Sequence, residues 1–139
     1  MRYDLDTLEE FCGEIGLDAQ MADNLSLQVL LGGGAVLCFQ NAARDEDCLV
    51  GFLDCPWHFH GDDLEFSDHH GHFVVLDLLN LLSGLCSGDV LICEHEVSGR
   101  LADRWLVHKI YNDELEHLKL GERLIVRRAG CADIEKADR

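Results

Sequence analysis

Residues 55–72 hold the side chains of this sequence that are best suited to chemistry. Five of the eight histidines lie in this segment together with four carboxylates. Imidazole nitrogen and carboxylate oxygen are the protein ligands that zinc, manganese, iron and nickel prefer. In an extended strand, His58 and His60 point to the same face, where two imidazoles can reach one ion. We therefore predict a transition-metal site formed by His58 and His60, with Glu65 or His72 as further ligands.

The same segment resembles the first metal-binding motif of the cupin family. That motif runs glycine, His-x-His, glutamate, glycine, and the order is matched here by Gly51, His58, His60, Glu65 and Gly71. The resemblance implies a small β-barrel that binds a transition metal. Two of the spacings differ from the motif by one residue. The family's second motif, which needs a proline and a histidine further along, is echoed here only at its end, by His108 and Asn112.

A simpler interpretation of residues 55–72 is a solvated loop. Aspartate, glycine and serine favour turns, and histidine is tolerated at a protein surface. Neighbouring carboxylates also stabilise protonated imidazoles, so the segment is equally compatible with a histidine-based response to pH. The sequence leaves these alternatives open.

The charge of the chain is acidic and unevenly distributed. The formal net charge is −16. Residues 1–99 contain nineteen acidic and two basic residues, whereas residues 100–139 contain eight and nine. A surface this negative repels phosphate backbones and anionic lipids, so we expect no nucleic-acid partner and no membrane partner. It favours a basic protein partner.

A small interaction protein fits this charge best. We predict that the protein binds and masks a basic protein, as an immunity-type inhibitor of a toxin does. Charge complementarity would accelerate the encounter, and a buried aromatic side chain would prolong the complex. Trp57 is the predicted aromatic anchor, and Asp62, Asp63 and Asp68 are the predicted acidic contacts. Homo-oligomerisation is left open.

Catalytic motifs are weak in this sequence, which favours a protein without enzymatic activity. There is no G-x-S-x-G nucleophile elbow. The seven cysteines are scattered without C-x-x-C spacing, and most lie in apolar runs where a thiol acts as a small core side chain. Glu94 and Glu96 share a strand face, but such a pair is more typical of a solvated edge than of acid–base catalysis.

The cellular compartment is expected to be the cytoplasm. No apolar run approaches the roughly 20 residues that span a bilayer. Residues 1–6 lack the basic and then apolar pattern of a signal peptide. The length of 139 residues suits a single soluble domain, which we expect over residues 1–128, followed by a flexible tail over residues 129–139.

Periodicity in the first half of the chain predicts one helix and a three-stranded meander. Thr7 and Glu10 form a capping-box pattern before a helix over residues 8–15, and Gly16 is a suitable end. Strands are expected over residues 25–31, 35–41 and 48–54, with Gly32-Gly33-Gly34 as a hairpin loop.

The second half is expected to contain a leucine-rich helix, a hairpin and a last strand. The helix spans residues 74–85, ends at Gly88, and has Leu78, Leu79, Leu82 and Leu85 on one face. Strands over residues 90–97 and 100–109 are joined by Ser98-Gly99. A short helix over residues 112–118 precedes a strand over residues 123–128. These elements predict an α+β fold with about six mainly antiparallel strands and two to three helices.

Overall fold

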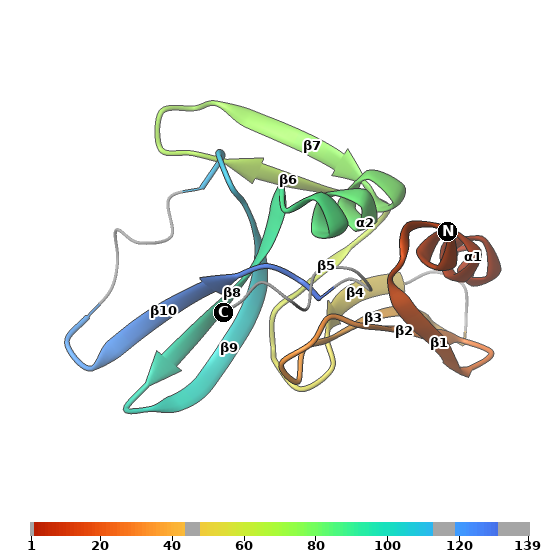
Figure 1. Ribbon diagram of the computed structural model, residues 1–139, viewed down its shortest axis with the longest axis horizontal. Helices are drawn as coiled ribbons and strands as arrows, with labels where there is room; N and C mark the ends of the chain where they lie inside the picture. The colour runs from red at the N-terminus through yellow and green to blue at the C-terminus, as the bar shows by residue number, and fades with distance from the viewer. Residues whose placement is uncertain (1, 44–47, 113–118, 131–139) are drawn as a thin grey trace.

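The structure is a computed structural model that describes residues 2–43, 48–112 and 119–130. Within these residues the chain forms two helices and ten strands, arranged in sheets of five, three and two strands (Figure 1). Neighbouring strands pair in the antiparallel sense in every sheet. The predicted α+β class with antiparallel sheets is confirmed.

The first half of the chain builds a five-stranded sheet whose strand order follows the chain order. The loop at Gly32-Gly33-Gly34 connects its second and third strands as predicted. All three glycines have positive φ angles, which L side chains rarely adopt. The Leu31 N–H donates to the Ala35 carbonyl across the loop at 2.9 Å. The strands of this sheet are β1 (Asp18–Asp23), β2 (Ser26–Leu30), β3 (Val36–Asn41), β4 (Cys48–Phe52) and β5 (His58–His60).

Strand β1 was not expected from the sequence. It contains few apolar residues, and its side chains are half-buried or exposed. It forms because it pairs with β2, which aligns Ala19 with Val29 and Met21 with Leu27. The pairing satisfies backbone N–H and C=O groups of β1 with hydrogen bonds to β2.

Helix α1 (Leu5–Ile15) begins earlier than the predicted capping box implies. The Asp4 carboxylate caps the helix by accepting hydrogen bonds from the Thr7 N–H at 3.1 Å and the Thr7 hydroxyl at 2.8 Å. Thr7 is therefore inside the first turn, and its prediction as the cap was wrong. The predicted end at Gly16 is confirmed, because this residue has φ of 87° and closes the helix.

Residues 63–87 form a hairpin followed by helix α2, where the sequence indicated a longer helix. The hairpin consists of β6 (Asp63–Ser67) and β7 (Phe73–Asp77), and α2 covers Leu78–Ser87. The predicted helix start at Val74 was wrong. A short apolar run is compatible with either structure, and here pairing with β6 makes it a strand. The Asp77 carboxylate then caps α2 by accepting from the Asn80 N–H at 2.8 Å.

The apolar face of α2 also differs in one position from the prediction. Leu79 is 40% exposed, whereas Leu81 is fully buried with Leu82 and Leu85. Leu78, Leu81, Leu82 and Leu85 form the buried face of α2. Gly88 ends the helix as predicted, with φ of 87°.

The last sheet has the order β10–β8–β9. Its central hairpin turns at Ser98-Gly99, as predicted, with positive φ at both residues. The predicted helix over residues 112–118 falls almost entirely on residues 113–118, which lie outside the described residues. The strands are β8 (Val90–Val97), β9 (Arg100–His108) and β10 (Glu122–Arg127).

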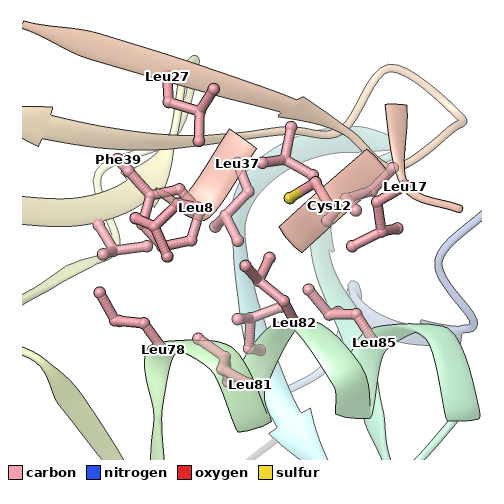
Figure 2. Packing of buried hydrophobic residues seen from close by; sticks show 14 of the residues in the cluster. Leu8, Cys12, Leu17, Leu27, Leu37, Phe39, Leu78, Leu81, Leu82 and Leu85 are labelled. Atoms are coloured by element: carbon pink, nitrogen blue, oxygen red, sulfur yellow. The ribbon is translucent and has the colours of Figure 1, made fainter. Parts of the chain in front are cut away.

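The core lies between the five-stranded sheet and the two helices, as Figure 2 shows. Side chains of α1 fill the space between the inner face of the sheet and the leucines of α2. Cys12 belongs to this layer and is fully buried. Four of the six described cysteines are buried, as expected for cysteines in apolar runs. The labelled core residues are Leu8, Cys12, Leu17, Leu27, Leu37, Phe39, Leu78, Leu81, Leu82 and Leu85.

Ala129 and Gly130, which follow β10, pack against the five-stranded sheet region. Ala129 is fully buried, and the Gly130 N–H donates to the Leu31 carbonyl at 2.8 Å. The rest of the predicted tail, residues 131–139, lies outside the described residues.

Candidate interaction surface

The two histidines of β5 lie together as the sequence predicted. Both side chains are exposed, whereas Phe59 between them is partly buried. Their ring centroids are 5.0 Å apart, and His58 Nδ1 lies 3.0 Å from the Pro56 carbonyl. β5 can approach β4 this closely because Gly51 faces His58 and has no side chain. A Cβ at Gly51 would lie 2.7 Å from the Trp57 carbonyl.

The other two predicted metal ligands belong to the β6–β7 hairpin. Glu65 is exposed in the middle of β6, and His72 lies in the turn before β7. Among the described residues, no group of three or more histidine, cysteine, aspartate or glutamate side chains is placed to hold a metal ion. The described strands also form sheets with linear strand orders, so they do not close the barrel that a cupin resemblance implies.

Asp68 organises the turn of the hairpin. Its carboxylate accepts hydrogen bonds from the His70 N–H at 2.8 Å and the His72 N–H at 3.0 Å, and it lies 3.2 Å from His72 Nδ1. Desolvation acts against its ionisation, but the hydrogen bonds from His72 and His70 outweigh that effect and lower the pKa of Asp68. This predicted partner contact therefore has a structural role in the turn.

The outer face of the hairpin combines exposed apolar and acidic side chains. We define this face by Asp63, Glu65, Phe73, Val75 and Asp77. Phe73 is 60% exposed and Val75 46% exposed. The strand register places Val75 directly opposite Glu65, and Asp77 opposite Asp63. An apolar row on β7 therefore lies beside an acidic row on β6.

The carboxylates on the β6 side of this face form no ion pair with a cation among residues 2–43, 48–112 and 119–130. Within the described part of the chain, neither Asp63 nor Glu65 takes part in an ion pair. Asp62, the residue before β6, is also exposed. Two of the three predicted acidic contacts, Asp62 and Asp63, thus lie at a surface where a basic partner can reach them.

A hollow of about 530 Å³ adjoins the outer face at Phe73. Ile110, one of the most exposed large apolar side chains, lies on its far side with Tyr111. The hollow offers a place for an apolar side chain of a partner, with Asp68 and His72 at its rim. Its lining residues are Asp68, Gly71, His72, Phe73, Ile110 and Tyr111.

Trp57, the predicted aromatic anchor, is half-buried and packs within the protein. Its ring lies 6.1 Å from that of Phe52 and 5.8 Å from that of Phe59. The Trp57 backbone N–H donates to the Asp103 carboxylate at 3.2 Å. The exposed aromatic residue is instead Phe73, which the sequence placed just before a helix. Exposure alternates along residues 73–77, but the sequence Phe-Val-Val-Leu-Asp does not alternate in polarity, so no local pattern identified Phe73 as a strand residue.

The larger hollow of the molecule, about 710 Å³, has a different character. It lies between Gly16, Leu17, Gly32 and Ala35, and Gly130 forms part of its wall. Among the described residues that line it, Asp18 has the single titratable side chain. The chain enters residues 131–139 directly beside it, and those residues are not described. We therefore place the candidate site at the hairpin.

The surroundings of Cys55, Glu94 and Glu96 differ from those of a reactive thiol and of an acid–base pair. Burial raises the pKa of Cys55 to about 11, with the nearby Asp54 acting in the same direction, so this thiol is protonated at neutral pH. Glu94 binds Arg104 at 2.9 Å, and Glu96 lies 3.7 Å from Arg123. Both glutamates therefore face arginines and do not form an acid–base pair.

Comparison with known proteins finds no relative of this chain. No protein-family model, curated protein or solved structure matches the chain. Neither of the described helices combines the length and the apolar character needed to cross a bilayer.

Proposed function

We propose that this protein is a small acidic cytoplasmic interaction protein that binds and masks a basic protein, as immunity-type inhibitors do. The observation that carries the proposal is the outer face of the hairpin. There Phe73 and Val75 are exposed beside Asp63 and Glu65, which have no ion pair among the described residues. A single patch can thus supply both an apolar anchor and complementary charge.

Two other charged parts of the described surface, on α1 and β10, do not combine these two properties. Helix α1 has exposed carboxylates at Glu10 and Glu14 but carries no exposed large apolar side chain. The exposed Val126 of β10 lies between basic residues, Arg123 and Arg127. The hairpin therefore suits a partner that is both basic and apolar better than either of these regions does.

Electrostatics would act mainly on the rate of encounter and on the choice of partner. The net charge of −16 attracts basic proteins over a range set by ionic strength, and it disfavours nucleic acids and anionic membranes. The cytoplasm is the proposed compartment because the seven scattered cysteines lack the pattern of a secreted disulfide framework.

Two variants with the same change in charge test the proposal. Asp63→Lys combined with Glu65→Lys alters the hairpin, and Glu10→Lys combined with Glu14→Lys alters α1 by the same amount. Each variant and the wild type are immobilised on a resin and incubated with a lysate of the source cells at low and at high salt. The retained proteins are identified by mass spectrometry. We expect the wild type and the α1 variant to retain the same basic protein at low salt, and the hairpin variant to lose it.

Three results would contradict the proposal. They are the absence of a retained protein at low salt, retention that is indifferent to salt, and equal losses in the two variants. Purified partner then provides the functional check, because masking requires that its activity falls in a stoichiometric mixture with the wild type.

Transition-metal binding is a second candidate, favoured by the geometry of His58 and His60. The two exposed imidazoles lie with their centroids 5.0 Å apart on one face of β5. Metal analysis of untagged protein after exposure to zinc, manganese, iron or nickel tests it. We expect one bound ion and a lower melting temperature after chelation. His58→Gln should lose the ion, whereas His70→Gln should keep it. A metal-free protein that responds to none of these ions would refute this candidate.

A further inference from the structure

Strand β7 has an edge that faces away from the body of the protein. It pairs with β6 in a two-stranded sheet, and no other described strand joins that sheet. Figure 1 shows β7 as the outermost strand of this region, with β6 between it and the rest of the molecule. The opposite edge of β6 faces β9 across a small hollow of about 190 Å³ that includes Trp105 and Val107. The accessible edge of the hairpin is therefore that of β7.

The hydrogen-bond register shows which backbone groups this edge presents. The Asp68 N–H donates to the His72 carbonyl at 2.9 Å, so these two residues are a hydrogen-bonded pair. Such pairs alternate with non-hydrogen-bonded pairs along an antiparallel ladder. The register therefore places Phe73 and Val75 in non-hydrogen-bonded positions. Their N–H and C=O groups point away from β6, and they make no hydrogen bond within the described residues.

The composition of β7 does not protect this edge. Edge strands are commonly shielded by lysine, proline or a bulge. The segment from Phe73 to Leu76 contains none of these, and its register with β6 is regular. An exposed apolar edge of this kind is the geometry that domains use to bind an extended peptide by adding a strand.

We propose that the β7 edge binds an extended segment of the basic partner as an added strand; this inference rests on the proposed function. An added strand would lie about two strand spacings, or about 10 Å, from β6. A lysine or arginine on its outer face can therefore lay its aliphatic stem over Val75 and bring its charge to Glu65. Side chains of the partner segment would alternate between the two faces of the extended sheet. Those on the outer face of the hairpin would be basic or apolar.

A second copy of this chain is a poorer occupant. Pairing of two β7 strands would bring together two molecules that each have a net charge of −16. It would also place the acidic rows of both hairpins on one continuous sheet face. Charge complementarity therefore favours a basic segment from another protein.

A proline at position 75 tests strand addition without disturbing the hairpin. The Val75 N–H points to the free edge, so Val75→Pro removes a donor that the β6–β7 ladder does not use. Val75→Thr is the matched control, because it keeps both the N–H and the branched shape. The probe is a fluorescent eight-residue peptide of alternating lysine and valine, and an alternating glutamate and valine peptide is its charge control. Thermal melting of each variant confirms folding.

We expect the wild type and Val75→Thr to bind the basic peptide with similar affinity. Val75→Pro should weaken binding by about tenfold or more, as the loss of a backbone hydrogen bond and blocked pairing would produce. In the wild type, the peptide should slow hydrogen exchange of the Phe73 and Val75 amides. Equal binding by the two variants, unchanged exchange at these amides, or equal binding of the acidic peptide would each overturn the proposal.

The same variants separate this inference from the proposed function. If the purified partner binds Val75→Pro normally but loses the Asp63→Lys, Glu65→Lys variant, the hairpin is the interaction surface and strand addition is wrong. If neither variant affects the partner, both proposals are wrong. Sedimentation that shows a dimer abolished by Val75→Pro would assign the edge to self-association and overturn the proposal as well.

Discussion

At the scale of single residues, His108 shows how burial changes the chemistry of a side chain. Its ring lies 5.8 Å from that of Phe66 and 5.0 Å from that of Tyr111, and its Nδ1 accepts a hydrogen bond from the Ile110 N–H at 3.1 Å. Desolvation lowers the pKa of His108, and the nearby Asp89 opposes this effect without cancelling it. The folded protein therefore holds a neutral imidazole at this position.

This environment predicts a loss of stability at mildly acidic pH. Below the ordinary histidine pKa of about 6.5, the unfolded chain binds a proton at His108 that the folded chain does not. The free energy of unfolding should fall with a slope of up to about 1.4 kcal/mol per pH unit, until the pH reaches the lowered pKa of the folded state. Urea unfolding at several pH values between 7.5 and 5 measures this slope.

The matched variants for this prediction are His108→Gln and the exposed His70→Gln. The first should have a smaller pH slope than the wild type, and the second is the control for replacing a histidine at the surface. An unchanged slope in His108→Gln would show that other groups cause the pH dependence.

Residues 58 and 60 also illustrate what periodicity can predict. Two residues that are two positions apart in a strand share a face, and the structure places His58 and His60 on one face of β5. The two-residue periodicity of a strand could not predict a third ligand. Glu65 and His72 belong to a hairpin whose position depends on α2 and on the strands that follow.

At the scale of elements, the contact between α2 and β8 depends on the absence of a side chain. Gly84 is buried in α2, and a Cβ at this position would lie 2.6 Å from Cγ2 of Val90. The helix can therefore approach the strand closely only with glycine here.

Gly84→Ala should consequently destabilise the protein, although alanine is the better helix former. Overpacking in a core costs about 1–3 kcal/mol, against a gain in helix propensity of about 1 kcal/mol. Denaturant unfolding should show a net loss of roughly 1 kcal/mol. In a double-mutant cycle, Val90→Ala should relieve part of this loss.

Gly13→Ala in α1 is the control for that substitution. A Cβ at Gly13 would meet nothing within 4 Å, so this change should stabilise the protein by up to about 1 kcal/mol. Equal effects of the two alanine substitutions, or no coupling between positions 84 and 90, would argue against the packing explanation.

At the scale of the whole molecule, a buried arginine connects the two larger sheets. Arg104 of β9 binds Glu94 of β8 at 2.9 Å and Asp54, which follows β4, at 3.0 Å. Arg127 of β10 also reaches Glu94, at 3.2 Å, and donates to the Gly32 carbonyl at 2.9 Å. Desolvation opposes ionisation of Glu94, but Arg127 and Arg104 outweigh it and lower the pKa of Glu94.

Arg104→Met should therefore lower the free energy of unfolding of the protein. Breaking a buried ion pair by removing one partner costs about 3–5 kcal/mol, and the remaining Arg127 should keep the loss near the lower end of that range. Asp54→Asn should cost less than about 1 kcal/mol, because the Asp54 side chain is 60% exposed and its ion pair is screened by water.

Urea unfolding of both variants measures these two losses. A loss in Asp54→Asn as large as that in Arg104→Met would indicate that the link between the sheets, and not the buried pair on β8 and β9, dominates. A neutral Arg104→Met variant would show that the network contributes little to stability.

The sequence by itself determined the features that local chemistry decides. Glycines in left-handed conformations end the two described helices, at Gly16 and Gly88, and Ser98-Gly99 forms the turn between β8 and β9. Each follows from backbone geometry that needs no distant partner. The α+β class was predicted for the same reason, because alternation and helical spacing are local patterns.

Only the tertiary structure decided which ambiguous segments became strands and which side chains remained exposed. Residues 18–23 and 73–77 are strands because a neighbouring strand satisfies their backbone. Phe73 and Val75 are exposed because the opposite face of β7 packs towards α2. An apolar residue carries no local signal of the face it will occupy. The surface proposed to bind a partner therefore depends on pairing and packing between distant segments, which local sequence patterns do not encode.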